Sequence, residues 1–145
     1  MATKEGFTLG GVFFPIESAT FSTNGRELIL SIDGGESPGL DVEHDWWRLT
    51  PRLYADGAPI AVDADAEVVE IATDAGWLGD EPLLALYVHE HEEVTRCRGR
   101  LLRDGEAYRL ELEGEAEVMG RPFPFVLATA LLRESWPTPE PRFLR

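Results

Sequence analysis

Apolar and polar residues alternate in short runs over most of the chain, and turn-favouring dipeptides separate these runs. Four such dipeptides are Asn24-Gly25, Asp56-Gly57, Asp104-Gly105 and Gly120-Arg121. Asn, Asp and Gly tolerate the positive φ angles that a two-residue hairpin loop requires. The pattern therefore predicts a mainly β protein: a single antiparallel β domain whose meander forms a barrel or a sandwich, two architectures that alternate in the same way.

The hairpin at Asp104-Gly105 can be followed pair by pair. If these two residues form the loop, Cys97 faces Leu112 on an apolar side. The other side then pairs Arg98 with Glu111 and Arg96 with Glu113. Loops at the first and last dipeptides likewise pair Phe21 with Leu28, Ala19 with Leu30, Val118 with Phe123 and Ala116 with Phe125. The alternating Arg96, Arg98 and Arg100 are therefore expected on a solvated, charge-matched face rather than in a phosphate site.

One segment departs from strict alternation. Apolar Val68, Ile71, Ala72 and Ala75 recur at spacings of three and four. Asp63 or Asp65 can cap the start of a helix here, and Gly76 stands where a helix would end. We predict one short helix near residues 65–75, although the central residues also suit a strand.

The rest of the chain divides into one domain and a tail. Residues 83–90 are expected to form a strand with Leu84, Leu86 and Val88 on one face. Pro137, Pro139 and Pro141 stand at every second position near the end, which removes backbone donors and forbids a helix. We expect a single β domain over residues 1–132 and a Pro-rich extended C-terminal tail over residues 133–145.

The charge is strongly acidic and unevenly distributed. The chain has 27 acidic and 13 basic side chains, a formal net charge of -14. This balance argues against nucleic acid and anionic membranes as partners, since both bind clustered Lys and Arg. Residues 53–95 contain no Lys or Arg, so one region of the fold should project a strong negative potential. General solubility or adaptation to high salt would produce the same composition.

The single cysteine and the N-terminal residues help to predict the cellular compartment of the protein. Cys97 alone excludes an intrachain disulfide and a multi-cysteine zinc site. Lys4 and Glu5 are followed by no long apolar core, and no stretch reaches the length of a membrane-spanning helix. We expect a cytoplasmic protein, although a secreted chain that had lost its signal would look the same.

Three histidines are the candidate metal ligands. His89 and His91 alternate on the expected strand and so share one face, and His44 could supply a third nitrogen. The alternative is that both strand histidines face solvent, because they lie opposite Leu86 on that strand. Beyond this possible metal, no cofactor is expected.

Catalytic motifs are absent in recognisable form. The chain has no GxSxG elbow, no GxxxxGK phosphate loop and no GxGxxG fingerprint. Cys97 is expected in the core, where a thiol packs rather than reacts. We therefore assign no catalytic residue. Trp46 and Tyr54 are expected on an outer strand face beside arginines, a composition enriched in binding hot spots unless the same chain covers it.

These observations favour a non-catalytic interaction domain whose acidic face docks a basic protein partner, as an inhibitor, an immunity-type protein or an adaptor. The contacting residues would be Asp63, Asp65, Glu67, Glu70, Asp74, Asp80 and Glu81, with Trp46 and Tyr54 as anchors. A first alternative is a small β-barrel that binds an apolar ligand or a metal ion in its interior, lined by Phe13, Phe14, Phe21, Phe123 and Phe125. A second alternative is a structural or assembly protein, and a metal-dependent hydrolase using the three histidines is a further one. The oligomeric state stays open.

Overall fold

A computed structural model describes residues 5–35, 51–58, 60–62, 67–73, 77–78, 81–82, 85–87, 91–118 and 120–136. These residues form strands and connecting turns, and none of them is helical. The strands are β1 (Gly6–Leu9), β2 (Val12–Phe14), β3 (Ile16–Thr23), β4 (Leu28–Gly34), β5 (Arg52–Ala58), β6 (Val68–Thr73), β7 (Trp77–Leu78), β8 (Glu81–Pro82), β9 (Ala85–Tyr87), β10 (His91–Asp104), β11 (Ala107–Val118) and β12 (Arg121–Arg133).

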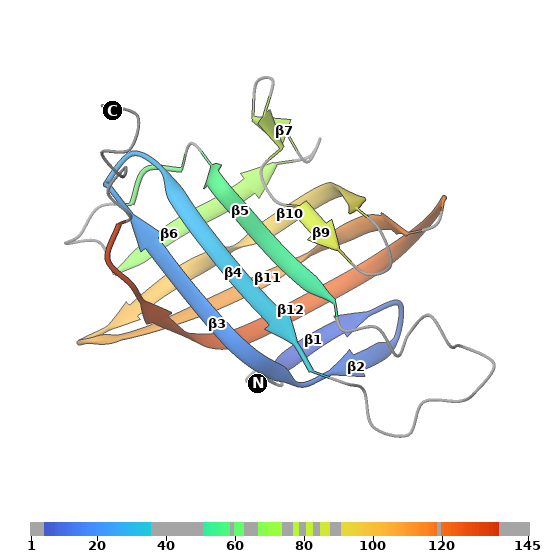
Figure 1. Cartoon of the computed structure of the whole chain (residues 1–145), viewed down its shortest axis with the longest axis horizontal. Coiled ribbons are helices and arrows are strands. Elements are labelled where there is room, and N and C mark those ends of the chain that lie inside the picture. The colour runs from blue at the N-terminus through green and yellow to red at the C-terminus, as the bar shows by residue number, and fades with distance from the viewer. Residues whose placement is uncertain are drawn as a thin grey trace, which may run out of the picture.

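Seven of these strands close into a barrel, in the order β11-β10-β9-β5-β4-β3-β12, with β12 pairing again with β11. In Figure 1, β3, β4 and β5 cross in front of β10, β11 and β12, which form the opposite wall. β1 and β2 extend the sheet from β12, and β6 pairs with β10. Every barrel pairing is antiparallel except that of β12 with β3. The predicted mainly β class is confirmed, and the closed ring decides for a barrel over a sandwich.

The barrel interior is filled with large apolar side chains. Alternation along each strand turns every second residue inward, and the largest of these inner side chains are at most 2 % exposed. They are Phe7, Leu9, Phe14, Phe21, Leu28, Leu30, Ile32, Leu53, Leu86, Leu110 and Phe125. The Phe7 and Phe125 rings stack with centroids 6.0 Å apart. Apolar burial of this kind is the main stabilising contribution to the fold.

Two inward-facing glycines allow β10 and β11 to bend. A Cβ atom on Gly99 would overlap the carbonyl oxygen of Glu111, and one on Gly114 would overlap the carbonyl oxygen of Arg96. Glycine in a strand interior marks a bend or a close backbone approach. Only glycine fits at these two places, and the long hairpin can therefore curve into the barrel wall.

The three hairpin registers predicted from the sequence are wrong by two residues. β10 pairs with β11 from Glu93↔Glu117 to Asp104↔Ala107, so the loop is Gly105 and Glu106 and not Asp104 and Gly105. Gly105 adopts φ +64° at the first loop position, which glycine tolerates without strain. A slip of two residues leaves every side chain on its face. The predicted apolar and charged sides are therefore confirmed, although Cys97 faces Gly114 rather than Leu112.

The other two hairpins are also displaced by two residues, the first in the same direction and the last in the opposite direction. Thr23 pairs with Leu28, so the first loop has four residues. There the Asn24 side-chain oxygen accepts backbone N–H groups of Arg26 and Glu27, each at 2.8 Å. With a two-residue loop at Asn24-Gly25, the Arg26 and Glu27 N–H groups would belong to the strand pairing. Here the Asn24 side chain satisfies them instead. In the last hairpin Val118 pairs with Arg121.

Asp56-Gly57 is not a hairpin loop, and this prediction was wrong. Both residues lie within β5, which pairs with β4 along its length. Leu28 pairs with Ala58 and Ile29 with Asp56, so Gly57 is an extra residue on β5. It forms a β-bulge, the other common use of a glycine inside a strand.

The predicted helix near residues 65–75 was also wrong over Val68–Thr73, which form β6. Ile71 is buried and Val69 packs partly against the core, whereas Val68 and Glu70 are exposed. This period of two is a strand pattern. β-Branched residues next to an available strand partner favour the extended state, which overrides the spacing of three between Val68 and Ile71.

Of the strand expected at residues 83–90, the structure describes the part that forms β9, Ala85–Tyr87. Leu86 is completely buried and Tyr87 is 41 % exposed, so the predicted alternation is confirmed here. Leu84 and Val88 lie outside the described residues. The expected tail begins at the last residue of β12, and after it the Glu134 N–H donates to the carbonyl oxygen of Phe21 at 2.8 Å.

Candidate functional site

One outer wall of the barrel carries an ordered array of charges, called the charged wall below. It comprises the outward residues Glu70 on β6, Arg96, Arg98 and Arg100 on β10, and Glu111, Glu113 and Glu115 on β11. Strand pairing sets each Arg directly opposite a Glu: Arg96↔Glu115, Arg98↔Glu113 and Arg100↔Glu111. The charge-matched face predicted from the sequence is thus confirmed, with each partner displaced by two residues.

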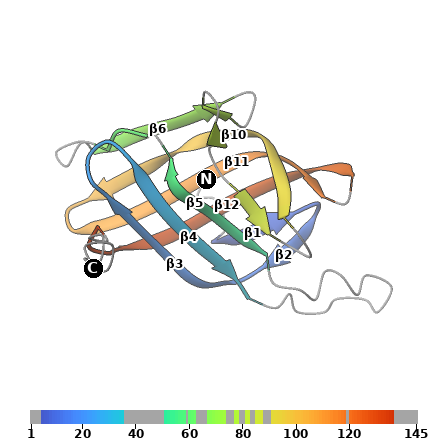
Figure 2. The same ribbon diagram turned by 45° about the horizontal axis from the view of Figure 1, so that its top comes forward.

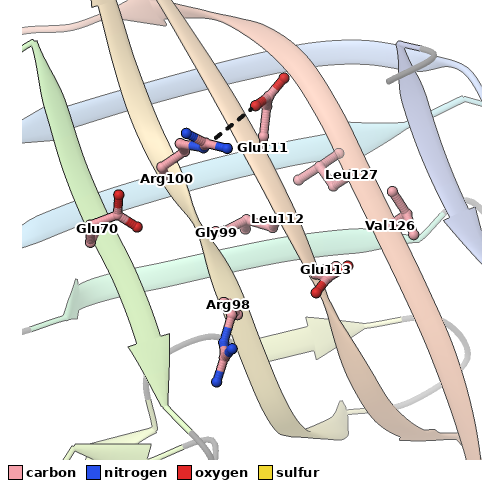
Figure 3. A pocket seen from close by; sticks show the side chains of 9 residues that line it. All are labelled: Glu70, Arg98, Gly99, Arg100, Glu111, Leu112, Glu113, Val126 and Leu127. Carbon is pink, nitrogen blue, oxygen red and sulfur yellow. Dashed lines mark ion pairs between the residues drawn. The ribbon is translucent and has the colours of Figure 1, made fainter. Parts of the chain in front are cut away.

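The charged wall is hollowed at its centre. A depression of about 460 Å³ is lined by Glu70, Arg98, Gly99, Arg100, Glu111, Leu112, Glu113, Val126 and Leu127. Figure 3 shows Arg100 directed toward Glu111, with Glu70 on the neighbouring strand β6. The Arg100 Nε and Glu111 Oε1 atoms lie 3.9 Å apart. Guanidinium donors and carboxylate acceptors therefore lie side by side in this hollow.

An ion-pair network joins this wall to the N-terminal strand. Arg109 Nη1 lies 2.7 Å from Glu5 Oε1, and Arg109 Nε lies 3.3 Å from Glu111 Oε2. Partial burial lowers the pKa of Arg109, but hydrogen bonds to Glu111 and Glu5 outweigh it and hold the pKa above its ordinary value. The guanidinium group is a structural tie between β11 and the residue that precedes β1.

A second outer surface gathers two tyrosines around Arg52, and we call it the tyrosine surface. The Arg52 guanidinium carbon lies 5.1 Å from the centroid of the Tyr54 ring, and Arg52 Nε lies 3.6 Å from Asp33 Oδ1. Strand pairing places Tyr87 directly opposite Arg52, and His91 opposite Tyr87. Sequence reasoning treated residues 52–54 and 87–91 as separate motifs. The short strand β9 brings them together.

The structure describes only part of the predicted acidic set. Glu67 and Glu70 are exposed at β6, and Glu81 lies in β8. Arg100 lies opposite Glu70 in the β6–β10 ladder, so a guanidinium group does stand beside this acid. The ion pair of Arg100 is made with Glu111 instead. The remaining predicted residues lie outside the described part of the chain: Asp63, Asp65, Asp74, Asp80 and Trp46.

The predicted metal site is described at one position only. His91 begins β10, whereas His44 and His89 lie outside the described residues. Within the described part of the chain, no three His, Cys, Asp or Glu side chains group closely enough to hold a metal ion. The three-histidine site stays a prediction.

Cys97 lies in the barrel core, as the strand pattern predicts. Its side chain is fully buried. Desolvation raises the pKa of the thiol to about 12, although nearby Arg96 acts in the opposite direction. The thiolate is the reactive form of cysteine, so this buried and protonated group is a packing residue.

The five phenylalanines expected to line an interior pocket have separate places. Phe14, Phe21 and Phe125 are buried in the core. The half-buried Phe13 packs its ring where Gly6 has no side chain, and since Phe14 points inward, Phe13 lies on the outer face. Phe123 packs against Gly10 and partly against the core.

Comparison with known proteins returned no relative: no family model matches the chain, and no curated protein or solved structure matches it. None of the described residues belongs to a helix that could cross a membrane.

Sequence reasoning missed the hollow in the charged wall and the Glu5–Arg109 tie. The signal for the hollow was present: Gly99 and Gly114 occupy positions of the alternating pattern where an apolar side chain is expected. Glu5 and Arg109 are separated by 104 residues, and no local pattern connects them.

Proposed function

We propose that this protein is a non-catalytic interaction domain that docks a basic protein partner through its acidic outer surface, as an inhibitor, an immunity-type protein or an adaptor. The observation that carries the proposal is the distribution of apolar and charged side chains between the inside and the outside of the barrel. In the described part of the chain, the interior is apolar and filled, whereas the charged and aromatic groups that could recognise a partner lie outside.

The interior offers no support for the alternative of an internal ligand. Its largest described side chains are at most 2 % exposed, whereas side chains that line an open chamber retain accessible surface. The one thiol is buried and protonated. These features favour a barrel that serves as a rigid scaffold for its outer faces.

Electrostatics favour a basic partner. A net charge of -14 raises the rate of encounter with cationic proteins and suppresses encounter with acidic ones. Glu67 and Glu70 are exposed at the edge of the barrel wall, and both lie within the stretch that lacks basic residues. Their carboxylates are oriented to the solvent, where a partner could reach them.

The tyrosine surface can supply anchoring contacts. Tyr87 is 41 % exposed, and Arg52 is held between Tyr54 and Asp33. Tyrosine and arginine dominate the energetics of many protein interfaces because large rigid groups lose little entropy on binding.

Affinity capture with the full chain, followed by measurement of binding to each captured protein, tests the proposal. The captured partners should be basic, and affinity should fall steeply between about 50 mM and about 300 mM salt. A Glu67→Gln, Glu70→Gln double variant should bind more weakly, whereas Glu106→Gln, an exposed acid at the β10–β11 loop, should bind like the wild type. Partners that are all neutral or acidic, or an affinity that ignores salt, would reject the proposal.

A further inference from the structure

Within the described residues, one edge of β6 is unpaired, on the side away from β10. The Arg103 N–H donates to the Glu67 carbonyl oxygen at 2.8 Å, so this pair is of the hydrogen-bonded type. Hydrogen-bonded and non-hydrogen-bonded pairs alternate along an antiparallel ladder. Residues 69, 71 and 73 therefore bond to β10, and the N–H and C=O groups of Val68, Glu70 and Ala72 point to the opposite edge.

The part of the chain that the structure describes places no second strand against this edge. Among the described strands, β6 pairs with β10 alone. In Figure 2, β6 runs along the upper rim of the molecule, with β10 beneath it. The backbone groups of the edge are thus positioned to bond an incoming chain.

β6 also lacks the usual protection of an edge strand. Natural edges are commonly blocked by Pro, Lys or a β-bulge. The sequence of β6 is VVEIAT, which contains neither residue, and its register with β10 is continuous over six pairs. Glu70 is the single charge on the strand.

The side chains of β6 define what an added strand should carry. Val68 is 45 % exposed and Glu70 is exposed on the outer face, so a Lys or Arg of the incoming strand would lie beside the Glu70 carboxylate. On the inner face, Val69 and Ile71 pack against the core, and an apolar residue suits the neighbouring position. An extended segment that alternates basic and β-branched residues meets both requirements.

We propose that β6 is a docking edge, to which an extended basic segment of a protein partner adds as a further β-strand. This inference rests on the proposed function and names how the partner binds. Backbone hydrogen bonds supply affinity in such strand addition, and the alternate side chains supply specificity. A second copy of the chain is a poor occupant, because symmetric pairing through Glu70 sets two carboxylates opposite each other and each copy carries a net charge of -14.

The test uses two synthetic peptides with capped ends and identical charge. The first has the sequence Thr-Val-Lys-Val-Arg-Val-Thr. The second is N-methylated at the alternate residues whose N–H groups would face β6, so it keeps its charge and loses those backbone donors. We expect the methylated peptide to bind at least about tenfold more weakly. We also expect the first peptide to protect the Val68, Glu70 and Ala72 amides from hydrogen exchange in NMR spectra.

Three variants of the chain test the role of β6 itself. Val68→Pro removes an outward N–H that the ladder with β10 does not use, and should lose binding. Leu132→Thr, at an exposed position of β12, should retain it. If Val68→Pro does not fold, Glu70→Lys replaces it, and should transfer binding from the basic peptide to one with Glu in place of Lys and Arg.

The outcomes separate this inference from the proposed function. Equal affinity for the two peptides, or no peptide binding at all, overturns strand addition at β6. Salt-dependent capture of basic proteins that persists in either case leaves the proposed function standing. If the chain neither captures basic proteins nor binds the peptide, both the inference and the proposed function are overturned.

Discussion

Gly99 and Gly114 face the inside of the barrel as diagonal neighbours across the β10–β11 ladder. Gly99 pairs with Leu112 and Gly114 pairs with Cys97, so the two glycines lie on the same face one pair apart. The absence of both side chains lets the two backbones bend inward together. Gly99 and Leu112 also line the hollow on the outside of the same wall.

Replacing either glycine should therefore destabilise the barrel. A Gly99→Ala variant places a Cβ atom against the Glu111 carbonyl oxygen, and we expect the free energy of unfolding in urea to fall by about 3 kcal/mol. Gly105→Ala is the matched control, since nothing lies within 4 Å of its Cβ position. It should lose only about 1 kcal/mol, from its positive φ. Equal losses for the two variants would show that the close approach in β10 does not matter.

Cys97 should make the protein less stable at alkaline pH. Burial raises the pKa of its thiol from 9.0 to about 12, so the unfolded chain releases this proton at a lower pH than the folded chain. The stability contributed by the protonated thiol is complete below pH 9.0 and is lost as the pH rises toward 12.

The pH dependence is measured by comparing urea unfolding of the wild type and Cys97→Ala at about pH 8 and about pH 10.5. The wild type should lose about 2 kcal/mol more than the variant over this interval. The cavity left by alanine lowers the stability of the variant equally at both pH values. A difference between the two proteins that does not change with pH contradicts the prediction.

The tie between Glu5 and Arg109 should contribute little to stability and should respond to salt. Both groups are partly exposed, and exposed pairs contribute about 0.2 to 1 kcal/mol. Glu5→Gln and Arg109→Gln should each lower the free energy of unfolding within that range, and the double variant should lose less than the sum of the two. Full additivity would show that the two side chains do not stabilise each other. A coupling that persists at about 1 M salt would show that their interaction is not mainly electrostatic.

The tyrosine surface should contribute to partner affinity rather than to folding. Tyr87→Ala should weaken binding to a captured basic partner by about tenfold or more and leave the unfolding midpoint nearly unchanged. Leu132→Ala is the control, since Leu132 is 67 % exposed and belongs to β12, away from β5 and β9. Equal loss of affinity in both variants would argue against a specific anchor at Tyr87.

Alternation predicted the faces of the strands more accurately than their partners. A slip of two residues preserves which side chains point inward, so Cys97 and Leu112 were assigned to the core correctly while their pairing was not. The helix prediction failed at Val68–Thr73 because β10 offers a long partner that local spacing does not reveal. The meeting of Arg52 with Tyr87 depends on the three-residue strand β9, and strand order of this kind is set by non-local packing.

The pairing of β1 with β12 and of β12 with β3 joins the beginning of the chain to its last strand. The ribosome must therefore synthesise β12 before the barrel can close, and until then Phe7 and Leu9 can pair with β2 but not with β12. Contacts between residues so far apart in the sequence make folding slow. The apolar strands that have not yet paired make a nascent chain prone to aggregation. We accordingly expect this barrel to depend on chaperones during synthesis more than its size alone would suggest.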